Sequence, residues 1–312
     1  MQHRQRSEME QEGRVREDSG GFRRRQRRRR EIGEREGEEG GEDQAQWLRV
    51  TSWNCRQIDQ ERWDWGEVSE MVGDQDVLLI QEVGVDTMYT LHTDQWKVIT
   101  HNLEKQVCIA VRGRVTQITE PISGIPGDFP GTMVLIGGGL VVGNVYLPPG
   151  RNSGECRKWM DAIQSQIQRF QEENRRVIIG GDWNARHPGL KVSRGWGEQG
   201  EGLDRMNLDE GSNTYGLQLL GLLALMEAKT TTGSGGDSGC NTFFHYSGIG
   251  SSRPDHIIGS KAMWEGNLIV GTSVRSNTGV SDHYMVTCQV KLITPKWLGH
   301  STTIGPKMGT KS

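Results

Sequence analysis

The most informative absences in this sequence concern long apolar runs, paired cysteines and net charge. No continuous apolar segment approaches the ~18 residues that a membrane-spanning helix needs, so no membrane partner is expected. The five cysteines are scattered without C-x-x-C spacing, which argues against a zinc module or a disulfide framework and fits a reducing compartment. The formal net charge is only −3, so composition neither requires nor excludes a nucleic-acid partner. The charged N-terminus does not have the apolar core of a secretory signal.

The distribution of apolar residues divides the chain into one large region and two polar ends. Residues 1–46 are rich in Arg, Glu, Gln and Gly and almost free of large apolar side chains, so we expect a disordered tail. Residues 47–293 carry the apolar runs of one domain, and residues 294–312 form a polar C-terminal tail. Within the first tail, the arginine block at 22–30 is typical of a nuclear-import signal or of a site for DNA or RNA phosphates. Flanking acidic residues equally allow an inert charged run.

Apolar runs bounded by turn residues predict the elements of the domain. Strands are expected at 48–53, 77–80, 107–111, 133–136, 140–146, 177–179, 241–244, 256–259 and 284–290. Helical spacing of apolar residues predicts helices at 65–72 and 159–170 and a mostly buried helix at 217–226. Because helices and strands alternate early while strand pairs dominate later, we expect an α/β sandwich with mixed β-sheets.

Polar residues with complementary chemistry stand where these strands end. The central pair is Asp182 and Asn184, which follow a buried run and two glycines, where a turn can direct both side chains into one cavity. Each such residue alone has an ordinary explanation, such as a turn, a helix cap or a packed tyrosine. Six strand ends of this kind together indicate one site, and they carry Asn54, Glu82, Tyr146, Asp182 with Asn184, Asp255, and Asp282 with His283.

Part of this set suits a divalent cation. Magnesium, for which manganese is a common substitute, prefers oxygen ligands and is usually held by one or two carboxylates together with substrate phosphate. We expect Glu82 to bind Mg²⁺, or Mn²⁺ in its place, with Asn54 and Asp282 as neighbouring ligands, directly or through water.

The remaining residues suit hydrolysis of a phosphodiester, in which a water must be oriented and negative charge stabilised. Asp182 is expected to hold and activate the water. His283 would donate to the phosphate or share the proton transfer, with Asp255 fixing its tautomer. Asn184 and Tyr146 are expected to donate hydrogen bonds to phosphoryl oxygens.

These motifs, in this order, resemble those of the endonuclease/exonuclease/phosphatase superfamily. The resemblance spans nearly all of residues 47–290 and implies a four-layer α/β sandwich with two mixed β-sheets and the site roles given above. It rests on Trp53-Asn54, Gln81-Glu82, Asn144-Val145-Tyr146-Leu147-Pro148-Pro149, Gly181-Asp182-Trp183-Asn184, Arg253-Pro254-Asp255-His256 and Ser281-Asp282-His283.

Within the superfamily, the sequence resembles the endonuclease domain of non-LTR (LINE-type) retrotransposons at 180–188, 213–217, 242–245, 252–258 and 281–283, with Trp183 where Phe is usual. The resemblance implies nicking of one DNA strand to leave a 3′-hydroxyl that primes reverse transcription, and hence DNA as substrate and a nuclear location. The sequence contains no reverse-transcriptase segment, so a fragment of a longer reading frame, a degenerate copy and a stand-alone nuclease all fit.

Two other functions stay open at this point. One is a phosphatase or phosphodiesterase that uses the same metal site on RNA, inositol phosphates or lipids. The other is a catalytically dead domain that binds nucleic acid or protein. The retrotransposon-like residues around Asp182 favour the nuclease, and the intact set of Glu82, Asp182, Asp255, Asp282 and His283 argues against loss of catalysis.

Overall fold

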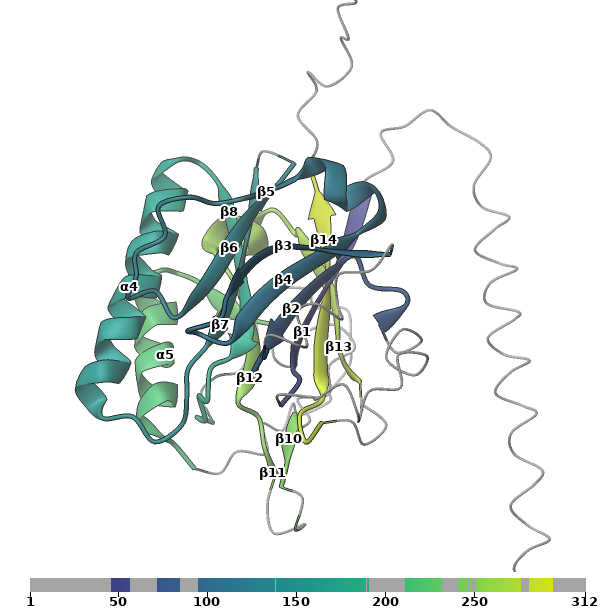
Figure 1. Cartoon of the computed structure of the whole chain (residues 1–312). Helices are drawn as coiled ribbons and strands as arrows, with labels where there is room; N and C mark the ends of the chain where they lie inside the picture. Colours follow the sequence, from purple (N-terminus) through teal and green to yellow (C-terminus); the bar gives the residue numbers. More distant parts are fainter. Residues whose placement is uncertain are drawn as a thin grey trace, which may run out of the picture. The chain divides into compact units, whose positions relative to one another are not determined.

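A computed structural model gives the fold of the chain (Figure 1). It describes residues 46–56, 72–84, 95–137, 139–188, 190, 211–231, 241–245, 247, 251–275 and 281–293. Of the predicted N-terminal tail only Gln46, the first strand residue, is described, and the predicted C-terminal tail lies outside the described residues. The helix predicted at 65–72 also lies outside them, except for its last residue.

The first of two six-stranded sheets has the order β13-β14-β1-β2-β4-β3. Within it, β1 and β2 are parallel and all other neighbours are antiparallel. In the parallel pair Asn54 lies opposite Gln81, so Glu82 follows at the same edge. The strands are β1 (Gln46–Asn54), β2 (Val77–Gln81), β3 (Trp96–Asn102), β4 (Val107–Arg112), β13 (Ile269–Arg275) and β14 (Met285–Leu292).

The second sheet has the order β5-β6-β7-β8-β12-β9 and likewise one parallel pair, β7 and β8. Asp182 at the end of β8 lies opposite Tyr146 on one side and Asp255 on the other. The strands are β5 (Thr119–Pro121), β6 (Gly131–Ile136), β7 (Leu140–Tyr146), β8 (Arg176–Asp182), β9 (Lys229–Thr230) and β12 (Asp255–Gly259). A third, two-stranded sheet pairs β10 (Phe243–Phe244) with β11 (Ser251–Ser252) in antiparallel orientation.

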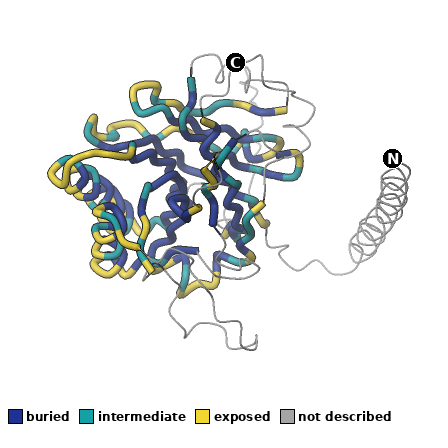
Figure 2. Tube along the Cα trace, turned by 90° about the horizontal axis from the view of Figure 1, so that it is seen from below, coloured by how far each residue is buried: buried dark blue, intermediate teal, exposed yellow. Residues whose placement is uncertain are grey.

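The two sheets pack face to face around an apolar core, which Figure 2 shows as buried chain with exposed residues on the outer helices and loops. Gly180 on β8 lies so close to the first sheet that a Cβ there would be 2.6 Å from Leu79 Cδ1. The long helices α4 (Ser153–Glu172) and α5 (Thr214–Leu225) cover the other face of the second sheet (Figure 1). The short elements η1 (Gly113–Ile118) and α6 (Lys261–Glu265) complete the described structure.

The α/β sandwich with two mixed sheets is the fold that the sequence predicts. All nine predicted strands and the helices around 159–170 and 217–226 are present. The prediction that the latter is mostly buried is partly wrong, because Leu217 and Leu225 are 57% and 64% exposed. No helix in the described ranges has both the length and the apolar character to cross a bilayer.

One buried polar side chain joins the two sheets close to the edge where Glu82 lies. Asn144 on β7 donates from Nδ2 to the carbonyls of Ile80 and Cys108, both at 2.8 Å, in the first sheet. Its Oδ1 accepts from Gln81 Nε2 at 2.6 Å. The amide therefore holds the end of β2, and with it Glu82, at a fixed place over the second sheet.

Replacing Asn144 by Ala should destabilise the fold by about 2–4 kcal/mol, because the buried groups that it bonds lose a partner and a cavity is left. Urea unfolding followed by circular dichroism measures this loss. Asn102→Ala is the control, since within the described residues the Asn102 side chain makes one bond, accepted from the Lys105 N–H in a turn, and the variant should lose less than about 1 kcal/mol. Equal losses in the two variants would contradict a bridging role.

Candidate active site

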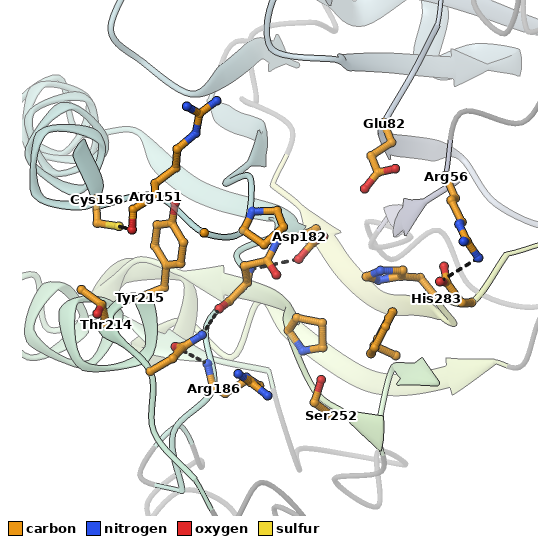
Figure 3. Close-up of a pocket in the computed structure, with 17 residues that line it drawn as sticks. Arg56, Glu82, Arg151, Cys156, Asp182, Arg186, Thr214, Tyr215, Ser252 and His283 are labelled. Atoms are coloured by element: carbon orange, nitrogen blue, oxygen red, sulfur yellow. Dashed lines mark hydrogen bonds and ion pairs between the residues drawn. The ribbon is translucent and has the colours of Figure 1, made fainter. Parts of the chain in front are cut away.

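The carboxyl ends of the two parallel strand pairs meet at one edge of the sandwich, beside a cleft of about 500 Å³ (Figure 3). Five of the predicted site residues line this cleft, namely Glu82, Asp182, Asn184, Asp282 and His283. The other three, Asn54, Tyr146 and Asp255, are buried and bond to residues of the first group. The fold thus brings together side chains that are up to 229 residues apart in sequence (54 to 283).

Asp182 is the centre of a hydrogen-bond network. The Asn54 amide donates from Nδ2 to Asp182 Oδ2 at 2.9 Å and to Glu82 Oε1 at 3.0 Å, and so links the two sheets. The Tyr146 hydroxyl donates to the same Glu82 oxygen at 2.9 Å. On the other side, the Asn184 N–H donates to Asp182 Oδ1 at 3.0 Å, as in an Asx turn.

The environment of Asp182 shifts its ionisation toward neutral pH. Burial, followed by the charge of Asp255, raises the pKa of Asp182 to about 7, while His283 and the hydrogen bonds from Asn184 and Asn54 act in the opposite direction. A carboxylate with a pKa near the working pH is suited to accept a proton from a bound water.

Asp255 and His283 form a buried pair next to Asp182. His283 Nδ1 lies 3.0 Å from Asp255 Oδ2, and the Thr242 hydroxyl donates to that same oxygen at 2.6 Å. Burial lowers the pKa of His283, but the negative charges of Asp255, Asp182 and Asp282 outweigh it and raise the pKa to about 10. His283 is therefore a cation at neutral pH.

Asp282 provides a second carboxylate at the cleft. Its Oδ2 forms an ion pair with Arg56 Nη1 at 2.9 Å. Its Oδ1 is buried and has no hydrogen-bond partner among the described residues. The unpartnered Asp282 oxygen and the Glu82 carboxylate, which lines the same cleft, are hard donors of the kind that magnesium prefers.

A different trio, Asp182, Asp255 and His283, also offers atoms within 4.8 Å of one another that could hold a metal. In that trio His283 Nδ1 already bonds Asp255, and a protonated imidazole has no lone pair for a metal. The donor chemistry therefore favours Glu82 and Asp282 over this trio.

Two of the site residues have left-handed backbone conformations. Asn184 has φ 45°, which asparagine tolerates, and Glu82 has φ 54°, which costs a residue of its type roughly 1–2 kcal/mol. Flanking backbone bonds hold Glu82 in this conformation, from Val83 N to Gln106 O and from Cys55 N to Gln81 O, both at 3.0 Å. The direction of the Glu82 carboxylate is therefore set by the backbone on both sides of it.

Two predicted phosphate contacts have protein partners in this arrangement. The Tyr146 hydroxyl donates to Glu82, and Asn184 Nδ2 donates to Leu147 O at 2.8 Å and lies 3.3 Å from Asp182 Oδ2. Burial, followed by the adjacent Glu82 charge, raises the pKa of Tyr146, so its hydroxyl stays protonated. Both residues orient the carboxylates, and their contacts with substrate stay predictions.

The sequence of this region decides the family. The family model of the endonuclease/exonuclease/phosphatase family matches residues 51–283, a span that includes every residue of the predicted site. The chain belongs to this family. Members of the endonuclease/exonuclease/phosphatase family are hydrolytic nucleases and phosphatases that generally depend on divalent metal ions.

Solved structures of low sequence identity share the fold. The endonuclease domain of TRAS1, a telomere-specific non-LTR retrotransposon, has 17% identity and a TM-score of 0.54, covering 78% of this chain and 99% of that chain. The 3′-5′ exonuclease NExo from Neisseria meningitidis has 19% identity, a TM-score of 0.57 and coverages of 78% and 100%. The AP endonuclease LMAP from Leishmania major has 12% identity, a TM-score of 0.60 and coverages of 80% and 89%. A comparison with curated protein sequences gives no significant match.

Asn213, which is not among the predicted site residues, holds the turn after Asp182. Its Nδ2 donates to Asn184 O at 2.6 Å, while its Oδ1 accepts from the N–H groups of Arg186 at 3.0 Å and Gly216 at 2.8 Å. The last bond is the N-cap of α5. An asparagine directly before an apolar helical run predicts such a cap but not its bond to the distant turn.

Replacing Asn213 by Asp separates the two roles of this side chain. A carboxylate still accepts from Arg186 and Gly216, but it has no donor for Asn184 O and repels that carbonyl. We expect Asn213→Asp to keep the melting temperature within a few degrees while hydrolysis falls by roughly tenfold or more, because small misplacement of catalytic groups is costly. Catalysis that is unchanged in Asn213→Asp would show that the bond to Asn184 does not position the site.

Proposed function

We propose that the chain is a metal-dependent DNA endonuclease that hydrolyses one phosphodiester and leaves a 3′-hydroxyl. The supporting observation is that a single cleft brings together the Asp182 carboxylate, the cationic His283 and two further carboxylates, Glu82 and Asp282. Such an arrangement combines a base for water, a donor for phosphate oxygens and donor oxygens for a cation.

The chemistry follows from the positions of the side chains. Asp182, held by the N–H of Asn184 and the amide of Asn54, orients the attacking water and takes its proton. His283, kept protonated by Asp255, donates to a phosphoryl oxygen as negative charge develops there. The bond to the 3′-oxygen breaks, and this oxygen takes a proton from solvent to become a hydroxyl. The phosphate, which has gained the oxygen of the attacking water, stays as a 5′-phosphate on the downstream fragment.

Glu82 and Asp282 would hold the metal ion, which supplies charge neutralisation at the phosphate and leaving oxygens. Asn54 and Tyr146 both donate to Glu82 Oε1 and so orient it. Groups that orient a metal ligand in this way commonly affect metal affinity. The predicted contact of Asn54 with the metal, directly or through water, stays a prediction.

Replacing Glu82 by Gln should raise the magnesium concentration needed for half-maximal activity by about tenfold or more. The amide oxygen can still accept from Asn54 and Tyr146, so the change removes charge and little else. Nicking rates across a magnesium titration measure the effect, with exposed Glu104→Gln as a control of equal charge change. An unchanged magnesium requirement would remove Glu82 from the metal site.

The function itself is tested with supercoiled plasmid and the purified full chain, with magnesium or with chelator. Open-circle product that requires magnesium, and whose ends prime a DNA polymerase, is the expected result. No nicking by a folded protein would contradict the proposal and lead to trials of inositol phosphates, lipids and polyadenylated RNA.

We further propose the non-LTR retrotransposon type of endonuclease, with a nuclear location and DNA as partner. The supporting observations are the similarity of residues 180–188 to that group and the TRAS1 domain among structural neighbours. The arginine block at 22–30 supports nuclear import and a contact with RNA.

Deleting residues 1–46 should leave the nicking of naked DNA unchanged. If the deletion abolishes nicking, the tail is part of the site.

A further inference from the structure

The cleft extends beyond the reacting groups along the turn that follows Asp182. Glu82, Asp182 and Asp282 contribute carboxylates to the lining of the cleft. Toward the amino ends of α4 and α5 its lining changes to cations, with Arg151 and Arg186. In the view of Figure 3, Arg186 and Glu82 lie on opposite sides of Asp182.

Arg186 differs from the other two arginines that line the cleft. Arg56 is paired with Asp282 at 2.9 Å, and Arg151 lies 3.9 Å from Glu155. Arg186 is exposed and forms no ion pair within the part of the chain that the structure describes. Its charge is therefore available to a ligand.

The backbone of Arg186 is rigidly placed even though its side chain is exposed. Its N–H donates to Asn213 Oδ1 and its carbonyl accepts from Asn213 N, both at 3.0 Å. Gly216 packs against the same peptide so closely that a Cβ there would be 2.1 Å from the Arg186 carbonyl oxygen. A cation on a fixed backbone loses less entropy on binding than one on a mobile loop.

The spacing relative to the reacting centre suits a neighbouring phosphate. Arg186 follows Asn184 by two residues, which span at most about 7 Å of chain. The charges of one DNA strand recur every ~3.4 Å along the helix axis, so this distance reaches a phosphate next to the reacting one. Guanidinium groups bind phosphate oxygens through two parallel donors.

We propose that Arg186 binds the DNA phosphate adjacent to the scissile one. This inference rests on the proposed function, because it takes DNA as the ligand. The turn at 182–188 would then both position the catalytic carboxylate and bind the DNA backbone. Arg186 is a substrate-binding residue and takes no part in proton transfer.

Equilibrium binding tests this role separately from cleavage. The full chain carrying Asp182→Asn, to prevent cutting, is titrated against a fluorescent DNA duplex at several salt concentrations between about 50 and 200 mM. Adding Arg186→Ala should weaken binding about 10- to 100-fold, the value of one charge-assisted bond. It should also reduce the slope of log affinity against log salt by about 0.9, the expectation for one lost phosphate contact.

Two variants make the result specific. Arg186→Lys should restore the salt slope, because it keeps the positive charge. Arg157→Ala removes an equal charge from an exposed position on α4 outside this cleft and should leave slope and affinity unchanged. Contacts by the arginine-rich tail add equally to every variant, so the difference isolates Arg186.

The outcomes separate this proposal from the assignment of endonuclease activity. An equal slope in the Arg186→Ala and parent proteins would overturn the Arg186 contact, whether or not the wild type nicks plasmid. If Arg186→Ala reduces the salt slope but the wild-type protein does not nick DNA, the phosphate contact is supported and the endonuclease assignment is contradicted.

Discussion

Asp182→Asn is expected to lower the rate of plasmid nicking by roughly 10²–10⁴-fold, the usual value of a positioned acid or base. The substitution keeps the volume of the side chain and an oxygen that accepts from the Asn184 N–H. It removes the carboxylate, whose pKa of about 7 makes it a suitable proton acceptor at neutral pH. Initial rates of open-circle formation at saturating magnesium measure the loss.

The control for this experiment is Asp161→Asn, which changes the same charge at an exposed position on α4. It should nick at the wild-type rate. Near-ultraviolet circular dichroism would show whether the Asp182→Asn protein keeps its tertiary structure. A folded Asp182→Asn protein that nicks normally would refute the assignment of Asp182 as the base.

His283→Ala is the second change with a large expected effect, again roughly 10²–10⁴-fold in rate. The substitution removes a buried cation that faces the reacting centre and leaves Asp255 without its partner at 3.0 Å. His101→Ala, at an exposed position on β3, is the matched control and should be silent. Activity in His283→Ala that matches wild type would remove the imidazole from the mechanism.

The same pair gives a pH dependence of stability. The pKa of His283 rises from 6.5 to about 10 on folding, so its stabilising effect is complete below about 6.5 and is lost as pH rises through about 10. Urea unfolding in chelator should therefore show wild type losing its advantage over His283→Gln between these pH values. A constant difference would mean that the imidazole is neutral in the folded protein.

Strand prediction succeeded where strands are buried on both faces and failed at the sheet edges. β2 and β7 are wholly buried, so their residues form continuous apolar runs. β3 and β13 are edge strands that mix buried and exposed positions. Each also contains a register shift, at 98–100 and 270–272, which breaks the alternation that marks a half-buried strand.

The site was predictable as a set of strand ends but not as a set of contacts. The carboxyl ends of parallel strands lie at one edge of a sheet, so Asn54 could be grouped with Glu82, and Tyr146 with Asp182, from sequence alone. Which atoms meet depends on the register and on the packing of one sheet against the other. The Arg56 ion pair and the Asn213 bond to the Asp182 turn join residues of separate segments, and no local pattern encodes them.

The Asn54 amide that touches both Glu82 and Asp182 has a further consequence, because these two carboxylates belong to different sheets. Neither sheet alone contains a complete reaction centre. The rate of catalysis therefore measures whether the two sheets are packed together in their native alignment. Loss of activity along a denaturant series should therefore coincide with cooperative unfolding of the whole domain and not precede it. For the same reason, substitutions that disturb the packing between the sheets should abolish activity even when every site residue is retained.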